Sequence, residues 1–155
     1  MDRTNIYRVL GDSEFFKDLD APSMEKIAGL CQMASYGVGD YLFRQGDMGD
    51  RIYVIAEGQI FLERTLDLGT RAGSATIGVL GKGRVLGCWS TLLGEPHNLM
   101  SSAACRQPTT VLIIKGANLR DMMVRNKELG FRVLENLCFL LRDRIQGAYG
   151  AMEKL

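Results

Sequence analysis

The side chains best suited to chemistry in this sequence lie in one short segment, LGCWSTLLGEPHN, which spans Leu86–Asn98. Its polar and aromatic residues are typical of the wall of a small-molecule site, where a few polar groups orient a ligand; they are Cys88, Trp89, Ser90, His97 and Asn98. The Trp89 ring can stack on a flat ligand or cover the core of the domain. His97 is the only histidine, and no Arg or Lys occurs between Arg84 and Arg106. The segment therefore favours a ligand that carries little negative charge.

These residue types form no pattern of catalysis or metal binding. The sole histidine has no serine or cysteine partner in a nucleophile-elbow motif, and paired carboxylates are absent from the segment. The four cysteines stand alone, without a CxxC pair or a Cys/His cluster; they are Cys31, Cys88, Cys105 and Cys138. We therefore expect a protein that is not an enzyme and holds no metal, with cysteines that act as small buried hydrophobic residues.

Length, composition and charge narrow the class of protein further. The 155 residues, 46% of them hydrophobic, are enough for one compact domain with its own core. The formal net charge of +1 gives no overall footprint for nucleic acid or for an anionic membrane. The first residues do not resemble a signal peptide, and no apolar run approaches the roughly 20 residues that span a bilayer. We therefore expect a cytoplasmic protein without a membrane partner.

The elements that must position the segment change along the chain. Between Ser13 and Ser35 apolar residues recur at helical spacing around Pro22, which predicts two short helices, the second with Ser23 as its N-cap. From residue 37 onward, alternating apolar and polar residues and frequent glycines predict short strands joined by tight turns. One hairpin is expected to turn in the Gly69–Gly73 region, and the last strand is expected at Thr109–Lys115.

From Ala117 onward the pattern is helical again, with a short helix ending near Asn126 and a long one after it. The long helix carries apolar residues at heptad spacing, and Val133, Leu137 and Leu140 widen the stripe. Such a stripe can pack on the chain's own barrel or pair with a second copy of the helix. We expect a homodimer through the heptad positions Phe131, Leu134, Cys138, Leu141 and Ile145.

Taken in order, these features resemble the cyclic nucleotide-binding domain family, which includes the sensory domains of the catabolite activator and the fumarate-nitrate-reduction regulator. The resemblance rests on a helical entry, the QGD and second GD turns, the strand ending in Glu57-Gly58, LGKGRVLG, and TTVLIIKGANLRDMM. It covers Phe15 to Ile145 and implies a mainly β fold with flanking helices, an eight-stranded jelly-roll β-barrel. The resemblance divides the single domain into N-terminal helices (1–36), a barrel (37–116) with a ligand cassette (86–102), and C-terminal helices (117–155).

The resemblance also assigns roles within the cassette. In the family a glycine precedes a short helix whose N–H groups face the cyclic phosphate, a glutamate accepts from the ribose hydroxyl, and an arginine neutralises the phosphate. Gly87, Leu92, Leu93 and the GEP turn match this pattern. Cys88 stands where the glutamate belongs, and the arginine position falls on uncharged residues near His97–Leu99. The resemblance therefore implies a diverged cassette that binds cyclic nucleotides weakly.

Three interpretations follow from this divergence. In the first, the pocket binds another small molecule, with Leu86, Gly87, Cys88, Trp89, Ser90, His97 and Asn98 at its wall. In the second, a cyclic nucleotide binds weakly with Arg71 or Arg84 as the cation. In the third, Leu99, Met100 and their neighbours fill the pocket, and the domain is a dimerisation or protein-interaction module without a ligand. Haem ligated by Cys88 or His97 is a variant that the pattern disfavours, because a lone cysteine or histidine usually serves packing.

The first interpretation is the one we adopt: a non-enzymatic regulatory module that senses a small molecule and signals through its C-terminal helices. Family members that regulate transcription carry a helix-turn-helix domain after these helices. Only about ten residues follow Ile145 here. If the chain is complete, we therefore expect no direct DNA binding. The sequence names neither the ligand nor the downstream partner.

Overall fold

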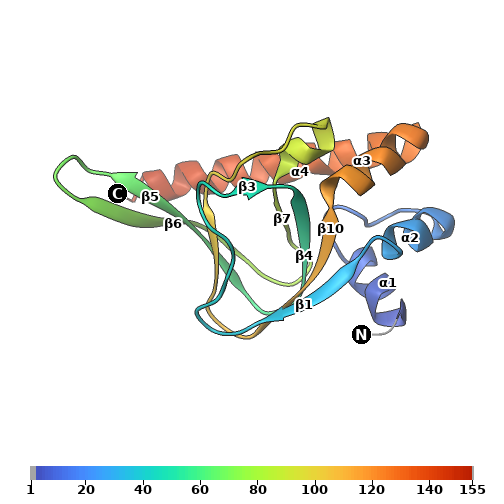
Figure 1. Cartoon of the computed structure of the whole chain (residues 1–155), viewed down its shortest axis with the longest axis horizontal. Helices are drawn as coiled ribbons and strands as arrows, with labels where there is room; N and C mark the ends of the chain where they lie inside the picture. Colours follow the sequence, from blue (N-terminus) through green and yellow to red (C-terminus); the bar gives the residue numbers. More distant parts are fainter. Residues whose placement is uncertain (1–2, 155) are drawn as a thin grey trace.

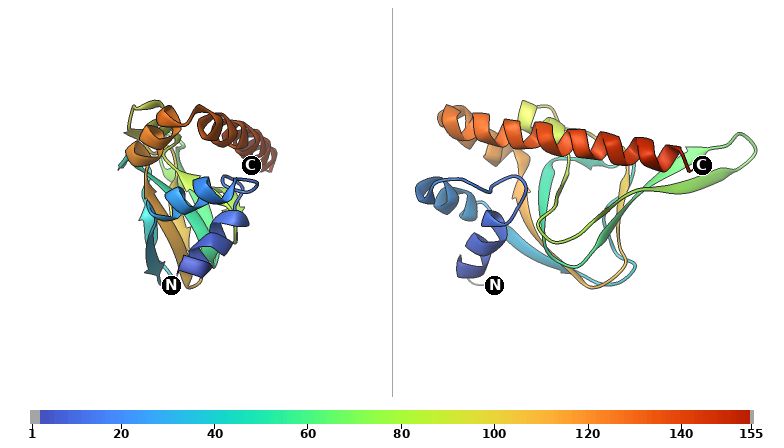
Figure 2. Two further views of the ribbon diagram at one scale, coloured as in Figure 1. Left: turned by 90° about the vertical axis from the view of Figure 1, so that its right-hand side faces the viewer. Right: turned by 180° about the vertical axis from the view of Figure 1, so that it is seen from behind.

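The computed structural model describes residues 3–154, which form two N-terminal helices, a β-structure and two C-terminal helices (Figure 1). The helices are α1 (Arg3–Gly11), α2 (Ala21–Ala28), α3 (Gly116–Arg125) and α4 (Lys127–Met152). Helix α4 runs along one side of the β-structure, from α3 to the β5–β6 hairpin, as the view from behind also shows (right view of Figure 2). Among the described residues no helix is long and apolar enough to cross a membrane.

The strands form two four-stranded antiparallel sheets and one small sheet. The first sheet has the order β1 (Gln32–Tyr36), β10 (Thr109–Lys115), β4 (Arg51–Glu57), β7 (Val85–Gly87). The second has the order β2 (Tyr41–Phe43), β9 (Ser102–Cys105), β5 (Ile60–Asp67), β6 (Ala72–Leu80), and β3 (Met48–Gly49) pairs with β8 (His97–Asn98). This arrangement confirms the jelly-roll architecture. The described residues form ten strands where eight were expected, because the two-residue strands β3 and β8 pair separately.

The central strand β4 separates two hydrophobic cores. Its side chains alternate between the sheet faces, as the two-residue period of a strand requires. Ile52 and Val54 pack toward the helices, in a core that also contains Phe15. Tyr53 and Ile55 pack between the two sheets, in the core inside the barrel. Because both faces of β4 are covered, its five central residues are all buried, and the strand is a fixed support for β7 and the cassette.

The predicted N-terminal region differs from the structure in three ways. Helix α1 lies before Ser13, and the segment from Ser13 to Asp18 forms turns whose apolar side chains still enter the core. Residues 32–36, expected to follow in the helical region, form β1 because they pair with β10. Ser23 is not the N-cap of α2: the Asp20 carboxylate accepts from the Ser23 backbone N–H at 2.7 Å, a bond that also lowers the pKa of Asp20.

The secondary structure predicted for the rest of the chain is confirmed. The hairpin between β5 and β6 turns after Asp67 and before Ala72, and the last strand is β10 with the expected bounds. The short and long C-terminal helices are α3 and α4, separated only by Asn126. The side chain of Asn126 accepts from the Leu129 N–H at 3.1 Å and so caps α4. Met1, Asp2 and Leu155 lie outside the described residues.

Candidate functional site

A cavity of about 310 Å³ lies between the cassette and helix α4. This volume is at the lower end of the range for small-molecule sites. The cassette and the residues after it supply one part of its wall: Leu86, Gly87, Cys88, Trp89, Ser90, His97, Asn98, Leu99, Met100 and Ser101. Helix α4 supplies another part, and the barrel supplies the rest, including Phe43, Leu62, Arg64 and Ile77. One cavity therefore joins the cassette to the C-terminal helix.

The start of the cassette is fixed by a close approach of β7 to β4. Gly87 has a φ of 136°, in the region that favours glycine. A Cβ atom at this position would lie 2.3 Å from the carbonyl oxygen of Arg51. The next residue, Cys88, donates its backbone N–H to that same oxygen at 3.0 Å. Only glycine therefore allows the chain to leave the sheet here and form the cassette turn.

The cassette turn itself is held by helix α3. Residues Trp89–Leu93 form a short 3₁₀ helix, η1. The carbonyl oxygen of Leu92 accepts from Arg120 Nη1 of α3 at 2.6 Å. Thr91 is buried and packs against Gly116, where an added Cβ would meet the Thr91 hydroxyl oxygen at only 1.7 Å. The cassette turn is therefore in direct contact with α3, which α4 follows after one residue.

Nine of the residues expected at the site line this cavity, although their surroundings differ. Cys88 is buried, and its thiol points to the carbonyl oxygen of His97 at 3.5 Å. Trp89 packs its ring against Phe15 at 5.6 Å between centroids, as expected of a side chain that covers the core. The side chain of Met100 is exposed. Leu99 and Met100 therefore leave an open cavity beside them, in contrast to the interpretation in which they fill it.

The two cations proposed from the sequence are placed elsewhere. Arg71 lies at the end of the β5–β6 turn, where its carbonyl oxygen accepts from the Leu68 N–H. Arg84 donates from Nε to the Glu14 carboxylate at 3.1 Å. Neither residue lines the cavity. In this structure one lies at a hairpin tip and the other is paired with a carboxylate, so the expectation that one of them swings into the pocket stays a prediction.

Two other cations line the cavity instead, and neither was predicted from the sequence. Arg64 comes from β5 and donates to the carbonyl oxygen of Met100. Arg144 comes from α4, where it is only 16% exposed, and burial lowers the pKa of its guanidinium. Both are far from the cassette in sequence and reach it only through the fold. The cavity wall is therefore not without positive charge.

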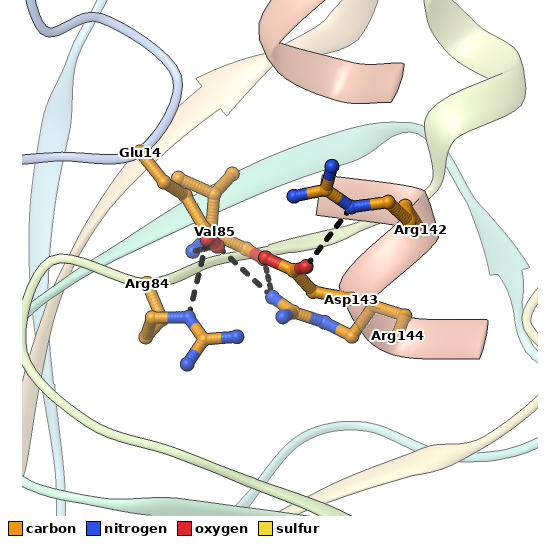
Figure 3. A network of polar contacts seen from close by, with 6 residues as sticks. All are labelled: Glu14, Arg84, Val85, Arg142, Asp143 and Arg144. Carbon is orange, nitrogen blue, oxygen red and sulfur yellow. Dashed lines mark hydrogen bonds and ion pairs between the residues drawn. The ribbon is translucent and has the colours of Figure 1, made fainter. Parts of the chain in front are cut away.

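Arg144 belongs to a network centred on Glu14 (Figure 3). The Glu14 carboxylate accepts from the Arg84 Nε, from the Val85 N–H at 2.7 Å and from Arg144 Nη2 at 3.0 Å. The same Arg144 nitrogen also donates to the carbonyl oxygen of Val85 at 2.6 Å. One carboxylate thus joins the N-terminal segment, the strand that leads into the cassette, and helix α4. The second terminal nitrogen, Arg144 Nη1, is buried and has no partner.

Four of the five heptad positions expected at the dimer interface are exposed on α4, and the fifth packs against the core. The buried face of the helix includes Val133, Leu137 and Leu140. Phe131, Leu134, Cys138 and Ile145 are exposed. Leu141 instead packs against the core on the helical side of β4. Leu141 and Ile145 both line the cavity, because they lie beside the buried stripe of α4. No group of three His, Cys, Asp or Glu side chains that could hold a metal occurs among residues 3–154.

A jelly-roll whose cassette and last helix line one cavity is the fold of cyclic nucleotide-binding regulatory domains. The sequence profile of the cyclic nucleotide-binding domain matches residues 33–126, and the chain belongs to this family. Its sequence is 32% identical over 163 residues to "cGMP-dependent protein kinase, isozyme 2 forms cD5/T2" of Drosophila melanogaster. That match covers 99% of this chain but only 16% of the kinase.

Solved structures agree with this membership. A cyclic nucleotide-binding domain from Methylobacillus flagellatus superposes with a TM-score of 0.81 at 21% identity, covering 99% of this chain and 84% of that one. The catabolite activator protein of Thermus thermophilus superposes with a TM-score of 0.72 at 28% identity, covering 91% of this chain and 62% of that one. The first superposition, at 21% identity, shows the shared fold alone. The second shows that part of the catabolite activator protein has this fold too.

Proposed function

We propose that this chain is a non-enzymatic regulatory domain that binds a small molecule in the cavity between the cassette and α4. The ligand is one other than cyclic AMP or cyclic GMP, or these nucleotides bind only weakly. The observation that carries the proposal is the cavity itself, since cassette residues and α4 residues line the same space. A ligand there touches both the family's binding segment and the helix that follows it.

The cassette supports a ligand different from that of the wider family. Cys88 stands where the family resemblance expects the ribose-binding glutamate; its buried thiol donates to the His97 carbonyl oxygen and is itself only a weak acceptor. No cation occurs between Arg84 and Arg106 to neutralise a phosphate at the cassette. Each of the two missing charge-assisted bonds costs about 1.5–3 kcal/mol, so the affinity for a cyclic nucleotide should fall by about 100-fold or more.

Helices α3 and α4 provide the route by which binding is transmitted. Leu141, Ile145 and Ala148 line the cavity from α4, so an occupant contacts this helix directly. Arg120 and Gly116 join the cassette turn to α3, which precedes α4. If these helices have two positions, a ligand that binds one of them more tightly raises the population of that position. The size of the shift is set by the ratio of the ligand's affinities for the two positions.

Calorimetry and thermal denaturation test the ligand proposal. We expect cyclic AMP and cyclic GMP to bind more weakly than low micromolar, whereas low-micromolar binding of either would contradict the divergence of the cassette. In a metabolite panel, at least one compound should raise the Tm. Ala148→Trp, which fills the cavity, should abolish that increase, and Ala151→Trp on the same helix should preserve it, since Ala151 is not in the wall. A panel in which nothing stabilises the protein would instead support an interaction module without a ligand.

We further propose that the domain forms a homodimer through α4. The exposed residues Phe131, Leu134 and Ile145 repeat at heptad spacing along one side of the helix, and Tyr149 and Met152 are exposed beyond them. Such a row of exposed apolar side chains is typical of an interface. In analytical ultracentrifugation, Phe131→Glu should convert the dimer to a monomer, whereas Phe139→Glu, outside the heptad positions, should not. A wild-type monomer at high micromolar concentration would refute the dimer.

A further inference from the structure

We propose that Arg144 is the anion-binding residue of this cavity, and that Glu14 competes with the ligand for it. The inference rests on the proposed small-molecule site and names the chemical class of its ligand: an apolar molecule that carries one anionic group, such as a sulfonate, phosphate or carboxylate. The cation then comes from α4 and not from the cassette.

The hydrogen bonds of the Arg144 guanidinium carry the first step. Nη2 is fully engaged, by Glu14 at 3.0 Å and by the Val85 carbonyl at 2.6 Å. Nη1 is buried from solvent, yet it is the one buried side-chain nitrogen or oxygen among residues 3–154 with no partner. Buried donors in folded proteins are almost always paired, and a charged one is the most costly to leave free. Because Arg144 lines the cavity, a small turn of its guanidinium would bring this nitrogen within reach of an acceptor oxygen bound there.

The charges around Arg144 carry the second step. Glu14 is the carboxylate that faces it, and this carboxylate is shared with Arg84. The neighbouring Asp143 lies beside Arg142, with its carboxylate 3.5 Å from the Arg142 Nε. Arg64 also lines the cavity and adds a further positive charge. The two formally charged side chains that line the cavity, Arg64 and Arg144, are therefore both positive, which favours an anion over a neutral ligand.

The wall of the cavity carries the third step. Apart from the two arginines, it is formed mainly by apolar side chains, among them Phe43, Leu62, Ile77 and Leu141. A small inorganic anion would leave these surfaces without a partner. A molecule with an apolar body and one charged end satisfies both parts of the wall.

Glu14 competes with such a ligand, because its carboxylate already binds the Arg144 guanidinium as an internal anion. Removal of the Glu14 charge should therefore increase the attraction of Arg144 for the anionic group of the ligand.

Two fluorescent probes that differ in one charged group test the proposal. 8-Anilinonaphthalene-1-sulfonate is an apolar anion, and N-phenyl-1-naphthylamine has the same ring system without the sulfonate. In fluorescence titrations the wild-type protein should bind the sulfonate about tenfold or more tightly than the neutral probe. Ala148→Trp identifies the part of each signal that comes from the cavity, since both probes can also adhere to exposed apolar surface.

Three variants separate anion binding from a structural role. Arg144→Gln should remove the preference for the sulfonate while leaving the affinity for the neutral probe within twofold. Arg142→Gln removes the same charge from a neighbouring position outside the cavity and should leave both affinities unchanged. Glu14→Gln should strengthen sulfonate binding several-fold without changing the neutral probe.

The possible results distinguish this proposal from the proposed function. Equal binding of the two probes by the wild type, or an equal loss of both in Arg144→Gln, would overturn the role of Arg144 and leave the small-molecule site intact. If neither probe gives a signal that Ala148→Trp removes, the cavity is not a small-molecule site, and both proposals fail together. Weaker sulfonate binding by Glu14→Gln would overturn the competition by Glu14.

Discussion

Replacement of Gly87 by alanine is the sharpest test of how the cassette is held. The added methyl carbon would lie 2.3 Å from the Arg51 carbonyl oxygen and 3.1 Å from the Cα of Ile52. These are backbone atoms of the central strand β4, which cannot rotate away as a flexible side chain can. The two strands would have to separate by roughly 1 Å to restore normal contact distances.

The expected cost follows from two contributions. A residue with a side chain at the φ of 136° found for Gly87 loses about 1–3 kcal/mol through backbone strain. Separation of the strands weakens the 3.0 Å hydrogen bond from the Cys88 N–H to Arg51, worth about 0.5–1.5 kcal/mol. Together these give a loss of about 2–4 kcal/mol in the free energy of unfolding. For a chain of this length that loss lowers the Tm by roughly 5–15 °C.

Urea denaturation followed by circular dichroism measures this loss, and probe fluorescence measures the cavity in the same samples. Gly150→Ala is the matched control, because an added Cβ there meets no atom within 4 Å and the position lies inside α4. Alanine should stabilise that helix by up to about 1 kcal/mol. A Gly87→Ala protein within about 0.5 kcal/mol of the wild type would refute the reasoning that glycine is required where β7 passes β4.

Further predictions concern single contacts of α4 and the cysteines. Asn136→Ala leaves the Phe15 carbonyl without the 2.7 Å bond from the buried amide and should cost about 1–3 kcal/mol in urea denaturation; a loss below about 0.5 kcal/mol would contradict it. In the monomeric Phe131→Glu variant at pH 8, a disulfide reagent should modify the exposed Cys138 first, so that an added Cys138→Ser removes the fast phase. Burial raises the pKa of Cys31 from 9.0 to about 12, so the free energy of unfolding should fall as pH rises from about 9 toward 12. Cys31→Ser should reduce that fall, and an unchanged pH profile would exclude the contribution.

The fold was predictable wherever the signal was local. The strand Thr109–Lys115 has the predicted bounds because a continuous run of β-branched and apolar residues lies between turn signals. The N-terminal prediction failed where the signal was ambiguous. Phe15 and Phe16 are spaced as in a helix, yet they enter the core from turns, and β1 exists only through its pairing with the distant β10. Long-range pairing of this kind leaves little trace in a short window of sequence.

The candidate site shows the same division. The cassette residues at the wall come from two short runs of one segment, 86–90 and 97–101, so that segment was enough to predict that they share a wall. The cations are different, because Arg64 reaches the cavity through the pairing of β5 in the second sheet and Arg144 through the packing of α4. The cassette segment itself contains no cation, as its sequence shows. The cavity nevertheless has two cations in its wall, because strand β5 and helix α4 also contribute to that wall.

One signal for Arg144 was nevertheless present in the sequence. Val133, Leu137 and Leu140 follow each other at steps of four and three residues along the buried face of α4. A further step of four gives Arg144, a charged residue on an apolar face. A buried cation in such a position needs a carboxylate or a ligand to offset its desolvation. Glu14 satisfies one of its terminal nitrogens, and the unpaired second nitrogen is why we assign the remaining partner to the cavity.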